Sequence, residues 1–220
     1  MQDRRFMSSS QAQAANIDAG LRSYMLGVYN HMTIGMAITG FFAYLTKIMS
    51  VSEGMLTPFG TAIYASPLKW VIMLAPLGMV FWLSAKVQTM KPESARNLFY
   101  AFAAIMGISL SSLLLVFTGE SVIRVFFLTA ASFSALSIYG YTTKKNLTSL
   151  GSFLIMGLVG LILASIVNIF LASSAMQFII SVVGVLIFAG LTAYDTQRIK
   201  LMYMASDDRG TALKKSIMGA

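Results

Sequence analysis

Six stretches of apolar residues, each about as long as a membrane is thick, constrain this chain more than any other feature of its sequence. They cover approximately residues 22–45, 68–84, 95–117, 121–142, 149–171 and 176–194. A helix needs about 20 apolar residues to cross the roughly 30 Å of hydrocarbon in a bilayer. The sequence therefore predicts an all-α, polytopic membrane helix bundle with six transmembrane helices.

The charge of the chain is also explained by a membrane. Charged residues make up 11% of the sequence, whereas a soluble domain has about 25%. The net charge of +8 is compatible with nucleic-acid binding, but the basic residues flank the apolar stretches, where they keep loops on the cytosolic side. We expect the lipid bilayer as a partner and no nucleic acid.

The basic residues also predict the orientation of the chain. With the N-terminus in the cytosol, three basic residues fall on the outer side, Lys47, Lys69 and Arg124. The other thirteen fall on the cytosolic side: Arg4, Arg5, Arg22, Lys86, Lys91, Arg96, Lys144, Lys145, Arg198, Lys200, Arg209, Lys214 and Lys215. This bias predicts a multi-pass membrane protein with a cytosolic N-terminus.

The chain divides into a polar N-terminal tail, residues 1–20, and a transmembrane helix bundle, residues 21–220. The tail has no apolar run and is therefore no secretory signal peptide. At the other end, residues 216–220 begin to turn apolar. We expect a seventh span, cut away here, to follow them, although a short natural tail is the alternative.

Small residues at four-residue spacing recur within the spans, as in Gly107 and Ser111, Gly160 and Ala164, and Ala189 and Ala193. Such spacing lets membrane helices approach closely. It predicts helix packing and says little about function.

One carboxylate is not explained by a solvated loop. Seven of the eight acidic residues lie in tails or loops, where we expect them to be solvated, but Asp195 follows nineteen uncharged residues, 176–194. An acid at that depth is costly and is functional by default. Partial desolvation and the negative end of the helix dipole both favour its neutral form, so we expect Asp195 to titrate closer to neutrality than a free aspartate. The alternative to a functional role is that Asp195 forms a structural ion pair at the membrane interface.

The neighbours of Asp195 suggest how such a site is built. Tyr194, Thr196 and Gln197 place hydroxyl and amide groups beside the carboxylate. Arg22 and Arg96 lie at a similar membrane level and are candidate cations for it, as are Lys86 and Lys144. Asp195 is also a candidate Ca²⁺ ligand, but Ca²⁺ takes six to eight oxygens, so a second acidic group is expected.

Several kinds of chemistry are excluded or unsupported. The chain has no cysteine and a single histidine, His31, which excludes thiolate and multi-histidine metal centres. No phosphate-binding glycine loop and no nucleophile–base pair is visible. We expect no enzymatic activity and no tightly bound cofactor. His31 is better explained as a hydrogen-bonded packing residue than as a proton relay.

The segment around Asp195 resembles a known signature. Residues 188–197, FAGLTAYDTQ, followed by Arg198-Ile199-Lys200, are similar to the signature of the Bax inhibitor-1 family, also called the transmembrane Bax-inhibitor-motif family. The segments 168–171 and 29–44 are similar to the preceding and first helices of bacterial members. The resemblance covers nearly the whole chain.

The resemblance implies a fold and an activity. Family members have seven transmembrane helices, with the last at the centre, and are implicated in a pH-dependent leak of Ca²⁺. Asp195 matches the first aspartate of the family's paired-aspartate pH sensor, whose second member lies in the last helix, beyond Ala220. Some bacterial members are associated with the membrane protease FtsH. The resemblance therefore implies a pH-sensitive Ca²⁺ leak channel or transporter of a bacterial inner (plasma) membrane, with a non-conducting regulator of that protease as the alternative.

Overall fold

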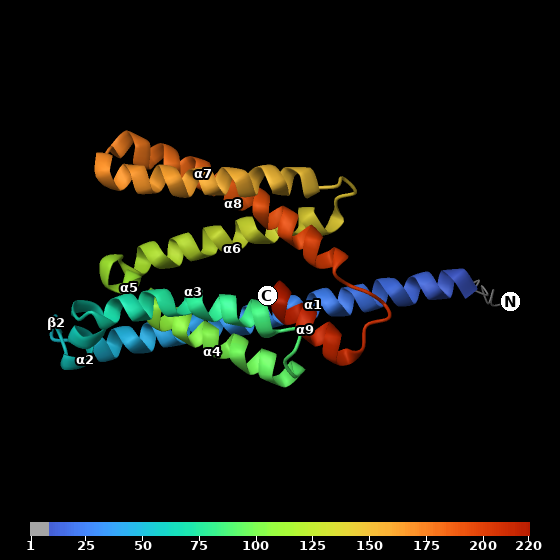
Figure 1. Ribbon diagram of the computed structural model, residues 1–220, viewed down its shortest axis with the longest axis horizontal. Coiled ribbons are helices and arrows are strands. Elements are labelled where there is room, and N and C mark those ends of the chain that lie inside the picture. Colours follow the sequence, from blue (N-terminus) through green and yellow to red (C-terminus); the bar gives the residue numbers. More distant parts are fainter. Residues whose placement is uncertain (1–8) are drawn as a thin grey trace. The chain divides into compact units, whose positions relative to one another are not determined.

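The computed structural model describes the backbone of residues 9–220 and the side chains from Ile17 onward. In these residues the helices are joined by loops and one small hairpin, and the chain forms two compact units (Figure 1). Unit 1 contains Met1–Val122 and Tyr203–Ala220, and unit 2 contains Ile123–Met202. Each unit is described by itself below.

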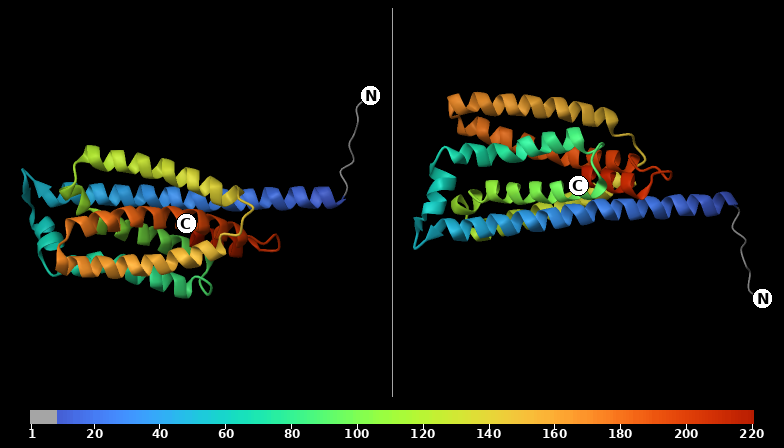
Figure 2. Two further views of the ribbon diagram at one scale, coloured as in Figure 1. Left: turned by 90° about the horizontal axis from the view of Figure 1, so that it is seen from above. Right: turned by 60° about the horizontal axis from the view of Figure 1, so that its bottom comes forward.

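Unit 1 is organised around a very long first helix, α1, which runs from Ser9 to Ser50. Helix α4 (Pro92–Leu110) packs along it, as the two views in Figure 2 show, and α3 (Leu68–Lys86) packs against α4. The last helix, α9 (Arg209–Gly219), packs on both α1 and α4. Residues 9–20 of the predicted tail are therefore part of α1, while residues 1–8 lie outside the described residues.

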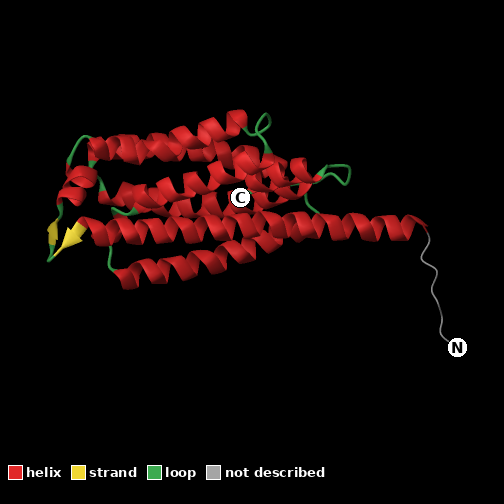
Figure 3. Ribbon diagram, turned by 90° about the horizontal axis from the view of Figure 1, so that it is seen from below, coloured by secondary structure: helices red, strands yellow, loops and turns green. Residues whose placement is uncertain are grey.

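The connection from α1 to α3 is more ordered than its mixed composition suggests. It contains strands β1 (Val51–Ser52) and β2 (Met55–Leu56), the short helix α2 (Pro58–Gly60) and the π-helical turn η1 (Thr61–Ala65) (Figure 3). Glu53 and Gly54 join the two strands with φ angles of 53° and 79°. Positive φ at both central residues is what a tight two-residue hairpin requires.

The third predicted span is interrupted near its outer end. Helix α4 stops at Leu110, and a short helix, α5 (Leu113–Val116), follows a turn. In that turn the fully buried Ser111 hydroxyl donates to the Ile108 carbonyl over 2.6 Å and lies 2.7 Å from the Tyr64 hydroxyl. The spacing of Gly107 and Ser111 predicts only packing, and it gives no sign of this break.

Unit 2 consists of three long helices, α6 (Gly119–Thr142), which begins in unit 1, α7 (Thr148–Leu171) and α8 (Ser174–Leu201). Helices α7 and α8 pack against each other and are joined by a tight turn. In that turn Ala172 has a left-handed backbone, and the Ser173 hydroxyl accepts a hydrogen bond from the Met176 N–H and so caps α8. Such a cap satisfies a backbone donor that the helix itself leaves free.

The sequence prediction of the spans is confirmed. Among the described residues, six helical segments are long and apolar enough to cross a membrane: Ile17–Ser50, Leu68–Lys86, Pro92–Val116, Gly119–Thr142, Thr148–Leu171 and Ser174–Leu201. Large apolar side chains on them are exposed, such as Phe170 at 84%. Side chains of this kind on a membrane helix face lipid rather than water, so the exposure agrees with an all-α polytopic membrane fold.

A buried apolar cluster of unit 1 lies between α9, α4 and the end of α3. Ile217 of α9, only 2% exposed, joins a cluster formed by Leu83, Val87, Ala95 and Phe99. By sequence alone, residues 216–220 are only the start of an apolar run. In the structure, residues 216–219 are the last turn of α9, and Ile217 among them belongs to this cluster.

Candidate functional site at the end of helix α8

The motif that the sequence singles out lies in the last three turns of α8, and three of its four side chains pack within unit 2. Thr196 is 5% exposed, and its hydroxyl donates to the Thr192 carbonyl over 2.9 Å. The same hydroxyl lies 3.1 Å from the Ser137 hydroxyl of α6. Thr196 therefore forms a buried polar contact between α6 and α8.

The backbones of α6 and α8 approach closely one turn from that contact. A Cβ atom on Gly140 would collide with the carbonyl of Ala193, which is itself 3% exposed. Ala193 belongs to a predicted pair of small residues, and its packing is confirmed. Gly160, from another predicted pair, has open space where a Cβ would be added, so small-residue spacing alone does not identify the contacts.

Tyr194 packs in another direction, against α7. Its ring covers Gly151, where an added Cβ would lie only 2.5 Å from the ring carbons. One helical turn before Tyr194, Gly190 of α8 faces Leu154 of α7. Tyr194 thus holds the end of α8 against α7, while Thr196 holds it against α6.

Gln197 fixes the loop between α6 and α7. Its side-chain oxygen accepts a hydrogen bond from the Leu147 N–H over 2.8 Å, and its amide nitrogen donates to the Lys145 carbonyl over 2.8 Å. Lys200, one turn further on, donates to the Tyr141 carbonyl over 2.8 Å, and its ammonium lies 5.0 Å from the centre of the Tyr141 ring. These side chains satisfy loop backbone groups that no helix or strand pairs.

Asp195 is the member of the motif that remains exposed. Its carboxylate has no hydrogen bond or ion pair with another residue of the described part of the chain, but Arg198, one turn later, interacts with it electrostatically. Arg198 is not among the cations predicted from the sequence, although its i,i+3 position on the same helix is the signal that could have identified it.

Arg22 and Arg96 are exposed residues of α1 and α4 and belong to unit 1, whereas Asp195 belongs to unit 2. Their pairing with Asp195 therefore stays a prediction. Arg96 does act electrostatically on His31 within unit 1. The Nδ1 atom of His31 lies 3.0 Å from the Tyr100 hydroxyl, which gives His31 the hydrogen bond between α1 and α4 that a packing role requires.

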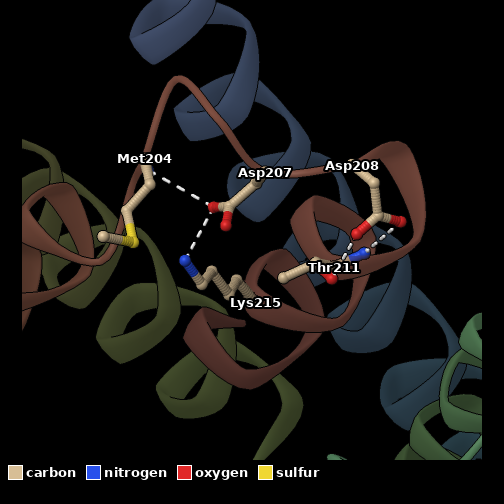
Figure 4. A network of polar contacts seen from close by, with 5 residues as sticks. All are labelled: Met204, Asp207, Asp208, Thr211 and Lys215. Carbon is tan, nitrogen blue, oxygen red and sulfur yellow. Dashed lines mark hydrogen bonds and ion pairs between the residues drawn. The ribbon is translucent and has the colours of Figure 1, made fainter.

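The linker from α8 to α9 contains a polar network that the sequence analysis does not anticipate (Figure 4). Asp207 accepts from the Met204 N–H over 3.3 Å and from the Lys215 ammonium over 2.6 Å. The side chains of Lys215 and Asp207 are only 20% and 11% exposed. The expectation that Asp207 is a solvated surface acid is therefore wrong, because the fold of α9 brings Lys215 back over it.

Asp208, the next residue, caps the N-terminus of α9. One carboxylate oxygen accepts from the backbone N–H groups of Gly210 and Thr211 over 2.8 and 3.2 Å, and the other accepts from the Thr211 hydroxyl over 2.5 Å. Hydrogen bonds to the charged form favour it. The Thr211 hydroxyl, followed by the two backbone N–H groups, thus holds the pKa of Asp208 below its ordinary value.

The linker also reaches α1 through aromatic side chains. The Tyr203 hydroxyl lies directly over Gly20, and the rings of Tyr203 and Tyr24 have centres 5.7 Å apart. Tyr24 is 6% exposed. The segment that follows α8 is therefore anchored to unit 1 by both packing and charge.

A resident metal site is not formed by the described residues. Nowhere in that part of the chain do three or more His, Cys, Asp or Glu side chains gather in a way that could hold an ion. Asp195 alone has too few oxygens for a tight Ca²⁺ site.

Comparison with known proteins identifies the family. The family model described as inhibitor of apoptosis-promoting Bax1 matches residues 21–220. An uncharacterized protein of Caulobacter vibrioides is 47% identical over 190 residues, which cover 86% of this chain and 76% of that one. The inner membrane protein YbhL of Escherichia coli K12 is 40% identical over 205 residues, 92% of this chain and 85% of YbhL. The chain therefore belongs to the Bax inhibitor-1 family of membrane proteins.

Proposed function

We propose that this protein is a pH-sensitive Ca²⁺ leak channel or transporter of a bacterial inner membrane and that it has no enzymatic activity. The observation that carries the proposal is the state of Asp195. It is an exposed carboxylate at the end of a membrane-spanning helix, and it has no hydrogen bond or ion pair in the described part of the chain. The proposed location is the one given in the name of its relative, the inner membrane protein YbhL.

The packing of α8 supports a role for Asp195 that its neighbours do not share. Thr196 and Gln197 are tied to α6 and to the loop after it, and Tyr194 is packed on α7. The helix end is thereby held in place while one acidic group remains available. Because the helix end is fixed in this way, protonation or deprotonation changes the charge of the carboxylate without moving the helix end.

The mechanism follows from coupled titration. Two carboxylates that share a proton stay together and keep the path closed, and loss of the proton makes them repel each other and opens it. Asp195 is one of the pair, and the resemblance to the family supplies the other from its last helix. The deprotonated carboxylate is also an oxygen ligand that a hard cation prefers, and a weak, incomplete site allows the ion to leave again.

The test is Ca²⁺ flux into liposomes containing the full-length protein, measured between about pH 5 and pH 8. The parent should conduct more at high pH. Asp195→Asn, which cannot deprotonate, should give low flux with a flat pH profile, while Asp195→Glu should keep a pH dependence. Glu93→Gln, which removes an exposed acid in the first turn of α4, is the matched control. A flux of unchanged size and pH profile in Asp195→Asn would rule out the gating role.

A second candidate function is regulation of a membrane protease such as FtsH without ion conduction. The favouring observation is the length of α1, whose 42 residues correspond to about 63 Å at roughly 1.5 Å per residue. This is about twice the hydrocarbon thickness, so part of α1 extends beyond the membrane and offers a helix to a partner.

Co-purification with the protease tests this second candidate. A variant that lacks residues 1–16 should lose the protease, and Asp195→Asn should retain it. If the shortened variant binds as well as the parent, the extension of α1 gives no support to a regulatory role.

A further inference from the structure

The positive charge of unit 2 is concentrated at one end. Unit 2 contains one acidic residue, Asp195, and five basic residues. Four of the basic residues lie either in the α6–α7 loop or in the last turn of α8, namely Lys144, Lys145, Arg198 and Lys200. We call residues 143–147 the basic loop; it is the yellow connection after α6 in Figure 1.

The charges at this end are not equivalent. Arg198 interacts with Asp195, and the Lys200 ammonium is occupied by the carbonyl and ring of Tyr141. Lys144 and Lys145 are exposed, and neither ammonium has an ion pair within the described part of the chain. The two cations on the basic loop thus have no acidic partner among the side chains that the structure describes.

The backbone that carries these two lysines is fixed. Gln197 accepts from the Leu147 N–H and donates to the Lys145 carbonyl, both over 2.8 Å. Within the loop, the Lys145 N–H donates to the Thr143 hydroxyl over 3.3 Å, and the Thr148 N–H donates to the Asn146 side chain over 2.9 Å. A held backbone presents the two ammonium groups in a constant place and lowers the entropic cost of binding an anion there.

Apolar side chains flank the basic loop on both helices that it joins. On the α7 side, Leu150 and Phe153 are 43% and 68% exposed and lie one helical turn apart. On the α6 side, Ile138 and Tyr139 are 64% and 49% exposed. Tyrosine at this level is typical of the membrane interface. A cationic group next to exposed apolar surface fits a ligand with an anionic head and hydrocarbon chains, and a soluble anion would not use the apolar part.

We infer that the basic loop binds an anionic phospholipid, with Lys144 and Lys145 contacting its phosphate-containing headgroup and the exposed apolar faces of α6 and α7 contacting its acyl chains. The same Gln197 that fixes the loop lies two residues from Asp195 on α8. A bound lipid therefore acts on the helix end that carries the candidate site. The inference itself does not depend on ion conduction.

The experiment measures lipid binding to the purified full-length protein. Fluorescently labelled phosphatidylglycerol is titrated into the protein in detergent, and labelled phosphatidylcholine is titrated in parallel. We expect the parent to prefer phosphatidylglycerol, and the double variant K144Q/K145Q to bind it roughly 25-fold more weakly, at about fivefold per lysine removed. The matched control K47Q/K69Q removes two lysines of unit 1, one in the last turn of α1 and one in the first turn of α3, and should bind like the parent.

A second variant separates the loop backbone from its charge. Gln197→Ala keeps both lysines but releases the loop, and we expect a smaller loss of affinity for phosphatidylglycerol than in K144Q/K145Q. Equal binding of the two lipids by the parent, or an undiminished affinity of K144Q/K145Q, would overturn the inference. Displacement of the labelled lipid by millimolar inorganic phosphate would overturn it too, because the recognised ligand would then be a free anion.

Discussion

Gly140 of α6 faces the carbonyl of Ala193 in α8 so closely that no side chain fits between them. The contact lies within one helical turn of the hydrogen bond between Ser137 and Thr196. A glycine is required here because the obstructing atom belongs to the backbone, which cannot turn aside as a side chain can. The position of the motif at the end of α8 therefore depends on a residue in another helix.

We predict that Gly140→Ala destabilises the protein by about 1–3 kcal/mol, the usual cost of overpacking a filled interface. Thermal unfolding of the full-length protein in detergent measures the effect. Gly160→Ala is the control, because open space surrounds the added methyl group in α7 and alanine favours helix over glycine. If both variants unfold at the parent's temperature, α6 and α8 do not approach as described.

Gln197→Ala should loosen the basic loop. The substitution leaves the Leu147 N–H and the Lys145 carbonyl without their partner, and Leu147 is 6% exposed. An unsatisfied buried donor costs about 1–3 kcal/mol. Hydrogen exchange of the Leu147 amide should become faster, whereas exchange in the middle of α7 should not change. An unchanged exchange rate at Leu147 would show that the hydrogen bond contributes nothing to the order of the loop.

Ile217→Ala should destabilise unit 1. Its side chain is 2% exposed and fills the cluster around Val87 and Phe99. Removal of a buried branched side chain leaves a cavity and costs about 2–5 kcal/mol. The neighbouring Met218 is 45% exposed, so Met218→Ala is a matched control with a much smaller expected effect. The comparison is made by thermal unfolding, and equal losses in the two variants would contradict the packing of α9.

Asp208 should make the start of α9 sensitive to acid. Hydrogen bonds from Thr211 and Gly210 lower the pKa of Asp208 in the folded state. A lowered folded pKa means that the contribution to stability is complete above the ordinary carboxyl pKa of about 4 and is lost as the pH falls through the lower value. The protection of the Thr211 amide, measured as its exchange rate relative to that of an unfolded peptide at the same pH, should therefore fall in acid.

The Asp208→Ala variant provides the comparison for that experiment. It should show low protection of the Thr211 amide at neutral pH and little further loss of protection in acid. The Asp207–Lys215 ion pair, which lies beside the cap, remains intact in this variant. Parent-like protection of Thr211 in Asp208→Ala would show that the cap is not held by this carboxylate.

The amino-acid sequence by itself determined the membrane fold and the position of the motif. Apolar length is a local property of the chain, because each helix must satisfy its own backbone hydrogen bonds in lipid. Four of the six spans could therefore be predicted within about three residues of their ends, whereas the first and the last are longer than predicted, at Ile17–Ser50 and Ser174–Leu201. Asp195 was identifiable for the same reason, since it ends an uncharged stretch.

Only the tertiary structure decided which way each residue of the motif turns. The four consecutive residues of the motif have different surroundings. Tyr194 packs on α7 and Asp195 is exposed, whereas Thr196 contacts α6 and Gln197 binds the α6–α7 loop. Likewise, Asp207 is paired and largely buried because α9 returns Lys215 to it. Contacts between residues far apart in the chain depend on how helices pack, and the sequence pattern of a single helix does not contain that information.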